Sequence, residues 1–131
     1  MTKQEMIMEA VACLGYVPQV DPDGDVLVRY QLKNMYVMVG QEDDPYVSVV
    51  LPQLAAVEEG GEKLALAICN KLTRDLKLAK LYLDHSLKSV SASCEFYYSD
   101  MENMTNSLQH ALTILGLVTR EYMKNQEEFG G

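Results

Sequence analysis

Few residues in this sequence of 131 amino acids are of a type and spacing that could support catalysis. His85 follows an aspartate in a segment typical of a turn, and His110 lies in a helical pattern beside Gln109. Neither histidine has the spacing from a second metal ligand or a nucleophile that known sites show. The sequence contains no glycine-rich nucleotide motif, CxxC pair, HExxH or GxSxG. We therefore predict that the protein is not an enzyme, and we assign no catalytic, cofactor-binding or metal-ligating residue.

An acidic run at residues 21–25, Asp-Pro-Asp-Gly-Asp, raises the question of a calcium site. An EF-hand loop starting at Asp21 would need glycine at its sixth position and a bidentate glutamate at its twelfth. Those positions hold Val26 and Leu32. Aspartate, proline and glycine are also the residues that favour tight turns. We interpret the run as a turn that leads into a strand.

The charge balance argues against several classes of partner. The chain carries 11 Lys and Arg against 19 Asp and Glu, and this net charge of −8 opposes binding to nucleic acid or to an anionic membrane. No signal-peptide pattern and no run of about 18 apolar residues occurs. We predict a cytoplasmic protein that has neither a nucleic-acid nor a membrane partner.

The composition is that of a folded domain. With 48% hydrophobic and 23% charged residues, and no linker-like stretch, residues 1–131 are expected to form one domain that needs no metal or disulfide to stay folded. The three cysteines, Cys13, Cys69 and Cys94, are widely spaced and fall on apolar faces. We expect all three to be buried, reduced thiols.

Local patterns predict three helices. Thr2 and Glu5 fit a capping box at the start of a first helix over residues 3–14, and Gly15 suits its end. A second helix is predicted to start near residue 58, where apolar residues begin to recur every four positions. A third starts near residue 100 and runs for about 24 residues, some 36 Å, after which residues 125–131 are expected to fray.

Alternating apolar residues predict five strands, of which the first three form an antiparallel meander over residues 26–51. The middle strand, residues 35–39, is apolar on both faces, which is unusual in a small domain. A two-residue hairpin turn at Lys33-Asn34 would pair Leu32 with Met35 and direct Met35 into the core. Pro52 is expected to end the third strand.

The other two strands are predicted at residues 79–84 and 89–98. In the second of these, serines alternate with apolar residues. Such an alternation is typical of a strand with one buried and one solvated face. We therefore expect its serine face to be exposed to water.

The resulting order is helix, three strands, helix, two strands, helix (αβββαββα), an α+β fold with helices packed on an antiparallel sheet. Four stretches are informative about the family: residues 25–30 (Asp-Val-Leu-Val-Arg-Tyr), 46–50 (Tyr-Val-Ser-Val-Val) and 78–84 (Leu-Ala-Lys-Leu-Tyr-Leu-Asp), and then the serine-alternating strand. Together they resemble the class I type III secretion chaperone-like fold and, within it, the YbjN family of small bacterial proteins. The resemblance covers nearly the whole chain. It implies a non-enzymatic protein, a chaperone or a regulator, that often dimerises and binds other polypeptides.

The far face of the meander is the predicted binding surface. If the helices cover only the inner face of the sheet, apolar side chains remain uncovered on the other face. We therefore predict a homodimeric module that binds a polypeptide partner through this face. The predicted partner-binding residues are Leu27, Tyr36, Met38, Tyr46 and Val50.

Two further predictions concern the dimer and an alternative function. Leu66 and Ala67 lie off the main apolar stripe of the second helix, either by accident or as a second contact face, and we assign them to the dimer interface. The alternative function is that of a small ligand- or metal-binding domain, or a minor enzyme. Its pocket would lie beside His85 or beside the acidic turn.

Overall fold

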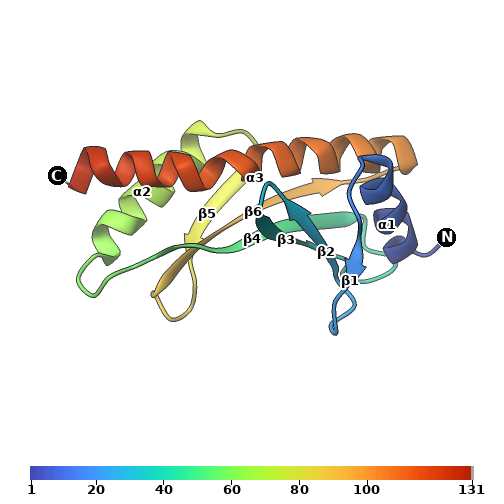
Figure 1. Cartoon of the computed structure of the whole chain (residues 1–131), viewed down its shortest axis with the longest axis horizontal. Helices are drawn as coiled ribbons and strands as arrows, with labels where there is room; N and C mark the ends of the chain where they lie inside the picture. Colours follow the sequence, from blue (N-terminus) through green and yellow to red (C-terminus); the bar gives the residue numbers. More distant parts are fainter. Residues whose placement is uncertain (131) are drawn as a thin grey trace.

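The computed structural model describes residues 1–130 and shows a six-stranded sheet with three helices (Figure 1). All neighbouring strands are antiparallel, in the order β1-β2-β3-β4-β6-β5. This is the predicted α+β fold, with one short strand, β1, that the sequence patterns do not predict. The elements are α1 (Lys3–Cys13), β1 (Gln19–Val20), β2 (Val26–Tyr30), β3 (Lys33–Met38), β4 (Tyr46–Ala56), α2 (Glu62–Asp75), β5 (Ala79–Leu83), β6 (Ser89–Tyr97) and α3 (Met101–Gly130).

The three helices lie on the same face of the sheet (Figure 1). α3 runs along the long axis of the molecule, and it contacts α1 near one end and α2 near the other. The strand residues that face the helices form one core with them, in which Val37, Val49 and Leu108 are fully buried. We call this the inner face of the sheet and the opposite one the outer face.

The ends of α1 follow the local sequence signals. Thr2 N donates to Glu5 Oε1 over 2.9 Å, and Glu5 N donates to Thr2 Oγ1 over 3.1 Å, so the predicted capping box is confirmed. Hydrogen bonding of the Glu5 carboxylate to Thr2 lowers the pKa of this carboxyl. Gly15 has φ +94°, a left-handed conformation that ends the helix without a steric penalty.

Lys3 is an unexpected member of the interior. Its side chain is buried, and Nζ donates to the carbonyl oxygens of Tyr46 (2.7 Å) and Gln41 (3.2 Å). Nζ also lies 5.8 Å from the ring centre of Tyr98. These contacts join the first turn of α1 to the loop before β4 and to the start of that strand.

The β2–β3 hairpin corrects the predicted register. The turn is Gln31-Leu32, with φ of 50° and 67°, and not Lys33-Asn34. Positive φ at both central residues is what a type I′ turn requires. Met35 therefore lies opposite Val28, and Leu32 is 85% exposed instead of pairing with Met35. The turn moves by two residues and the partner of Met35 by four, from Leu32 to Val28. Because this is an even number, the predicted inner side chains Met35 and Val37 still face the core.

β4 and α2 also depart from the predicted limits. β4 passes Pro52 and continues to Ala56, through an irregularity between Leu51 and Ala55 in its pairing with β6. α2 begins at Glu62 rather than near residue 58. Proline is tolerated in β4 because β3 no longer pairs with the strand at that point.

α3 is longer than predicted. Asp100 Oδ1 accepts a hydrogen bond from Asn103 N over 2.8 Å, and the helix then runs to Gly130 without fraying at residue 125. Asn125 is buried, accepts from Lys71 Nζ over 2.7 Å and donates to the Glu121 carbonyl over 2.8 Å. This contact with α2 holds the last turns of α3. Residue 131, which was expected to fray, lies outside the described residues.

The cysteine prediction is right for two positions and wrong for one. Cys69 and Cys94 are buried, and burial raises the pKa of their thiols to about 11 and about 12. Cys13 is exposed, because it lies at the last position of α1 on the side away from the core. It is a free thiol at the surface.

Candidate peptide-binding surface

The outer face is built from one row of residues that lie opposite each other on five successive strands. The register places Leu27 beside Tyr36, Tyr36 beside Val50, Val50 beside Ser93, and Ser93 beside Lys80. Residues in direct register share a face, so all five side chains project from the same side of the sheet. The row is apolar on β2, β3 and β4 and polar on β6 and β5.

The remaining predicted partner-binding residues lie beside this row. Met38 is two residues from Tyr36 on β3, is 40% exposed, and lies opposite Ser48. Tyr46 is 49% exposed at the start of β4 and stacks on Tyr97 with 4.5 Å between ring centres. The structure thus places Leu27, Tyr36, Met38, Tyr46 and Val50 on one uncovered face.

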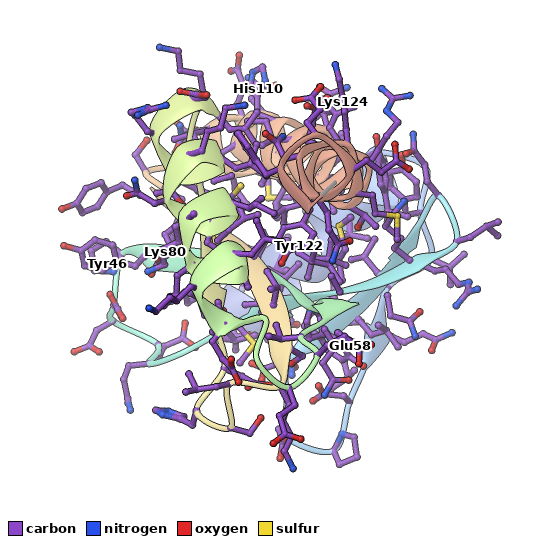
Figure 2. The ribbon with its side chains drawn as sticks, turned by 90° about the vertical axis from the view of Figure 1, so that its left-hand side faces the viewer. Tyr46, Glu58, Lys80, His110, Tyr122 and Lys124 are labelled. Carbon is purple, nitrogen blue, oxygen red and sulfur yellow. The ribbon has the colours of Figure 1, made fainter. Side chains whose placement is uncertain are left out.

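The Tyr46–Tyr97 pair closes one end of the outer face. The two hydroxyl oxygens lie 2.8 Å apart and share a hydrogen bond, which raises the pKa of Tyr46. In Figure 2 Tyr46 and Lys80 project from the same side of the molecule, whereas Glu58 projects from the opposite side. Tyr46 and Tyr97, which are 49% and 64% exposed, present aromatic surface at this end of the outer face.

The serines of β6 do not form the solvated face that their alternation predicts. Ser91 and Ser93 are buried between the longer side chains of β4 and β5, and Ser93 is only 2% exposed. A hollow of about 360 Å³ lies over this strip, lined by Ser48, Val50, Lys80, Tyr82, Ser93 and Glu95. Small side chains in the middle strands and long ones at the flanks produce the hollow.

The hydroxyl groups of these serines differ in their partners. Ser91 Oγ accepts a hydrogen bond from Gln53 N over 3.1 Å, and Ser89 Oγ donates to the Asp84 carboxylate. Ser93 Oγ has no hydrogen-bond partner among the described residues. A buried polar atom without a partner is costly, so the floor of the hollow favours a ligand with a polar group there.

A second opening lies where β3 and β4 separate. The two strands pair only from Tyr36 to Met38, opposite Val50 to Ser48. Beyond this point the gap has a volume of about 400 Å³, lined by Lys33, Asn34, Tyr36, Leu51, Pro52, Gln53, Leu54 and Thr119. We call it the β3–β4 opening. Sequence reasoning missed it, although Pro52 was a signal, since proline cannot donate in a ladder.

Leu66 and Ala67, the predicted dimer residues, do not belong to the outer face. Both are exposed on α2, and Leu66 is 53% exposed. The other side of α2 packs on the core through Ala65, Ile68 and Cys69. The helix therefore has a second apolar surface that faces solvent.

The histidines and the acidic turn are not assembled into a site. His85 and His110 are both exposed, and His110 points away from the sheet on α3 (Figure 2). Asp21 Oδ1 accepts hydrogen bonds from Asp23 N (2.9 Å) and Asp25 N (3.0 Å). These contacts are those of a tight turn, as predicted.

The carboxylates and thiols of the described chain form no cluster of three or more that could hold a metal ion. Beside His85, Asp84 accepts hydrogen bonds from the hydroxyls of Ser86 and Ser89, which lower its pKa to about 2. This arrangement stabilises the turn between β5 and β6. Within residues 1–130, no helix has the length and apolar character needed to cross a membrane.

The structure is a small α+β module in which helices cover one face of an antiparallel sheet and leave the other, partly apolar face uncovered. Residues 2–131 match the family described as "T3SS (YopN, CesT) and YbjN peptide-binding chaperone 1" (TY-Chap1), and the chain belongs to this family. The family assignment agrees with the resemblance that the sequence patterns indicate. No curated protein matches the sequence.

Two solved structures share the fold. YbjN from E. coli has a TM-score of 0.68 at 12% sequence identity, over 94% of this chain and 92% of that one. An uncharacterized protein from Methanothermobacter thermautotrophicus has a TM-score of 0.57 at 13% identity, over 97% of this chain and 99% of that one. At these identities the likeness concerns the fold alone.

Proposed function

We propose that this protein is a cytoplasmic, homodimeric chaperone or regulator that binds a polypeptide partner on the outer face of its sheet. The observation that carries the proposal is the cross-sheet row from Leu27 to Lys80, which no helix of the described chain covers. Membership of a peptide-binding chaperone family supports the protein-binding role. The outer face would supply the contact residues Leu27, Tyr36, Met38, Tyr46 and Val50.

The chemistry of the face specifies the kind of segment that fits it. The apolar half on β2–β4 suits large apolar side chains of the partner, whereas the half on β6 and β5 offers the Ser93 hydroxyl and the Lys80–Glu95 ion pair. A segment with one apolar and one polar edge satisfies both halves. The net charge of −8 favours partners that are basic.

The homodimer would use a different surface. Leu66 and Ala67 are exposed on the side of α2 that faces away from the core, which leaves the outer face free for the partner. Light scattering after size exclusion tests this, with a dimer mass expected at tens of micromolar. The variant Leu66→Asp should shift the mass to that of a monomer. A monomer mass for the unmodified protein removes the dimer from the proposal.

The partner-binding role is tested by affinity capture from native lysate, read by mass spectrometry. Met38→Asp places a charge among the predicted contact residues of the outer face and should abolish capture of the proteins that the unmodified chain retains. Leu117→Asp is the matched control, since Leu117 is 43% exposed on α3, away from the sheet. Unchanged thermal melting shows that both variants are folded. If Met38→Asp still captures the same proteins, the outer face is not the binding surface.

A further inference from the structure

The two halves of β4 differ in how many neighbours they have. Residues 46–51 have β6 on one side, and β3 pairs with residues 48–50 on the other. From Leu51 to Ala56, β6 is the one strand within residues 1–130 that pairs with β4. The second half of β4 is therefore a strand edge inside the sheet, next to the β3–β4 opening.

The hydrogen bonds around Ala56 show which backbone groups this edge presents. Val57 N donates to the Lys88 carbonyl over 2.8 Å, and Asp84 N donates to the Ser89 carbonyl over 3.0 Å. The Ser89 carbonyl therefore points toward β5 and not toward β4. Ala56, which lies opposite Ser89 on β4, is thus at a non-hydrogen-bonded position of the β4–β6 ladder. The N–H and C=O of Ala56 consequently point away from β6, toward the unpaired edge of β4.

The same alternation applies one pair earlier. Ala55 lies opposite Val90 and faces β6, so Leu54 also directs its N–H and C=O toward the opening. Pro52 has no N–H. Gln53 has φ +53°, and its N–H donates a hydrogen bond to Ser91 Oγ. The N–H and C=O groups of Leu54 and Ala56 therefore remain available on this edge. They are two residues apart, which is the spacing at which an antiparallel strand forms hydrogen bonds.

The opening also has the shape of a strand site. It extends from Tyr36, on the outer face, to Thr119 of α3, on the inner side. Further along the edge, a smaller hollow of about 140 Å³ is lined by Ala56, Val57, Leu64 and Tyr122, among others. Tyr122 lies beneath α3, between the helices and the sheet (Figure 2). An added strand would therefore have apolar side-chain contacts on the helix side as well as backbone partners.

We propose that an extended peptide segment binds in the β3–β4 opening as an additional strand, antiparallel to residues 51–56 of β4. The proposal rests on the proposed function and assigns the backbone part of peptide binding to this edge. Strand addition draws its affinity from main-chain hydrogen bonds and its specificity from alternate side chains. In the antiparallel orientation, the N-terminal end of the segment lies toward Glu58 and Glu59, which are exposed just after β4. The preferred segment carries basic residues at that end, followed by β-branched residues.

The probe for this proposal is an acetylated peptide, Lys-Lys-Thr-Val-Thr-Val-Thr-Val, with a C-terminal fluorescein. Fluorescence anisotropy should show saturable binding, with a dissociation constant below about 1 mM. On binding, amide hydrogen exchange at Leu54 and Ala56 should slow by about tenfold or more, because both N–H groups become hydrogen-bonded. The same peptide with Glu-Glu at its N-terminus should bind more weakly.

Two pairs of variants separate this edge from the rest of the surface. Ala56→Pro removes the edge N–H and should weaken binding about tenfold or more, whereas Ala56→Thr keeps the N–H and should bind normally. Thr119→Trp fills the opening from α3 and should also weaken binding, with Thr119→Ser as its control. If Ala56→Pro does not fold, the Thr119 variants still test whether the peptide binds in the opening.

Several results would overturn the assignment. Absence of saturable binding, or binding without slower exchange at Leu54 and Ala56, excludes strand addition at this edge. A dimer that dissociates in Ala56→Pro would assign the edge to a second copy of the chain instead. None of these results bears on the partner-binding role of the outer face, which is tested separately by loss of capture in Met38→Asp.

Discussion

The two faces of β3 and β4 are both rich in apolar residues, yet only one is used for folding. On the inner face, Met35 and Val37 are fully buried against the helices. On the outer face, Tyr36, Met38 and Val50 are covered only by their neighbours on the sheet. Residue type does not distinguish the faces, so coverage by helices must. A strand that is apolar on both sides can therefore serve the core with one face and a partner with the other.

Substitution of two methionines of β3, one on each face, tests this difference between the faces. It should give the largest change in the free energy of unfolding. Met35→Ala removes a fully buried side chain and should lower the free energy of unfolding by about 2–5 kcal/mol. Met38→Ala removes one that is 40% exposed and should cost less than about 1 kcal/mol. Urea denaturation followed by circular dichroism measures both. Equal losses would mean that the outer face is as tightly packed as the inner one.

Lys3 is the exception to an apolar interior, and removing its charge should have the next largest effect. Lys3→Met preserves much of the side-chain volume but leaves the carbonyls of Tyr46 and Gln41 without their donor. We expect a loss of about 1–3 kcal/mol in the free energy of unfolding. Lys63→Met, at an exposed position of α2, is the control and should change stability little. A neutral Lys3→Met would show that water replaces the lysine at both carbonyls.

Two serines of β6 sharpen the description of the outer face. Ser91→Ala removes an acceptor for Gln53 N and should destabilise the protein by about 1 kcal/mol. Ser93→Ala removes a buried hydroxyl that has no partner in the described chain, so it should be neutral or slightly stabilising. The same substitution should weaken partner binding if the partner uses that hydroxyl. Thermal melting compares the two variants, and a destabilising Ser93→Ala would mean that its hydroxyl is satisfied, for example by water.

The accuracy of the sequence predictions depended on how local their physical causes are. The capping box of Thr2 and Glu5 involves residues three apart, and it was predicted correctly. The hairpin register was wrong because Gln31-Leu32 adopts positive φ without a glycine, while Asn34 nearby is a commoner turn residue. The error left the faces unchanged, since a register shift of four residues, an even number, preserves strand alternation.

Predictions that depend on neighbouring strands were weaker. Pro52 was interpreted as the end of a strand, although proline is also compatible with an edge where no partner strand needs its N–H. Whether Pro52 ends the strand or lies on an unpaired edge depends on where the pairing between β3 and β4 stops. The local sequence does not contain that information. The burial of Ser93 likewise depends on the long side chains of adjacent strands, such as Lys80 and Tyr82. The outer-face residues, in contrast, followed from alternation alone.

The turn between β5 and β6 gives the smallest expected effect and concerns pH. Hydrogen bonds from Ser86 and Ser89 lower the Asp84 pKa to about 2 from its ordinary value of 3.8. A carboxyl whose pKa is lower in the folded state stabilises the fold at pH values above the ordinary value, and this contribution is lost as the pH falls toward about 2. Asp84→Asn should therefore show a shallower loss of stability between about pH 4 and pH 2. Urea midpoints across that range measure the slope. Identical slopes would mean that Asp84 is equally acidic in the unfolded chain, whereas a difference identifies this turn as an acid-sensitive point next to the serine strip of the outer face.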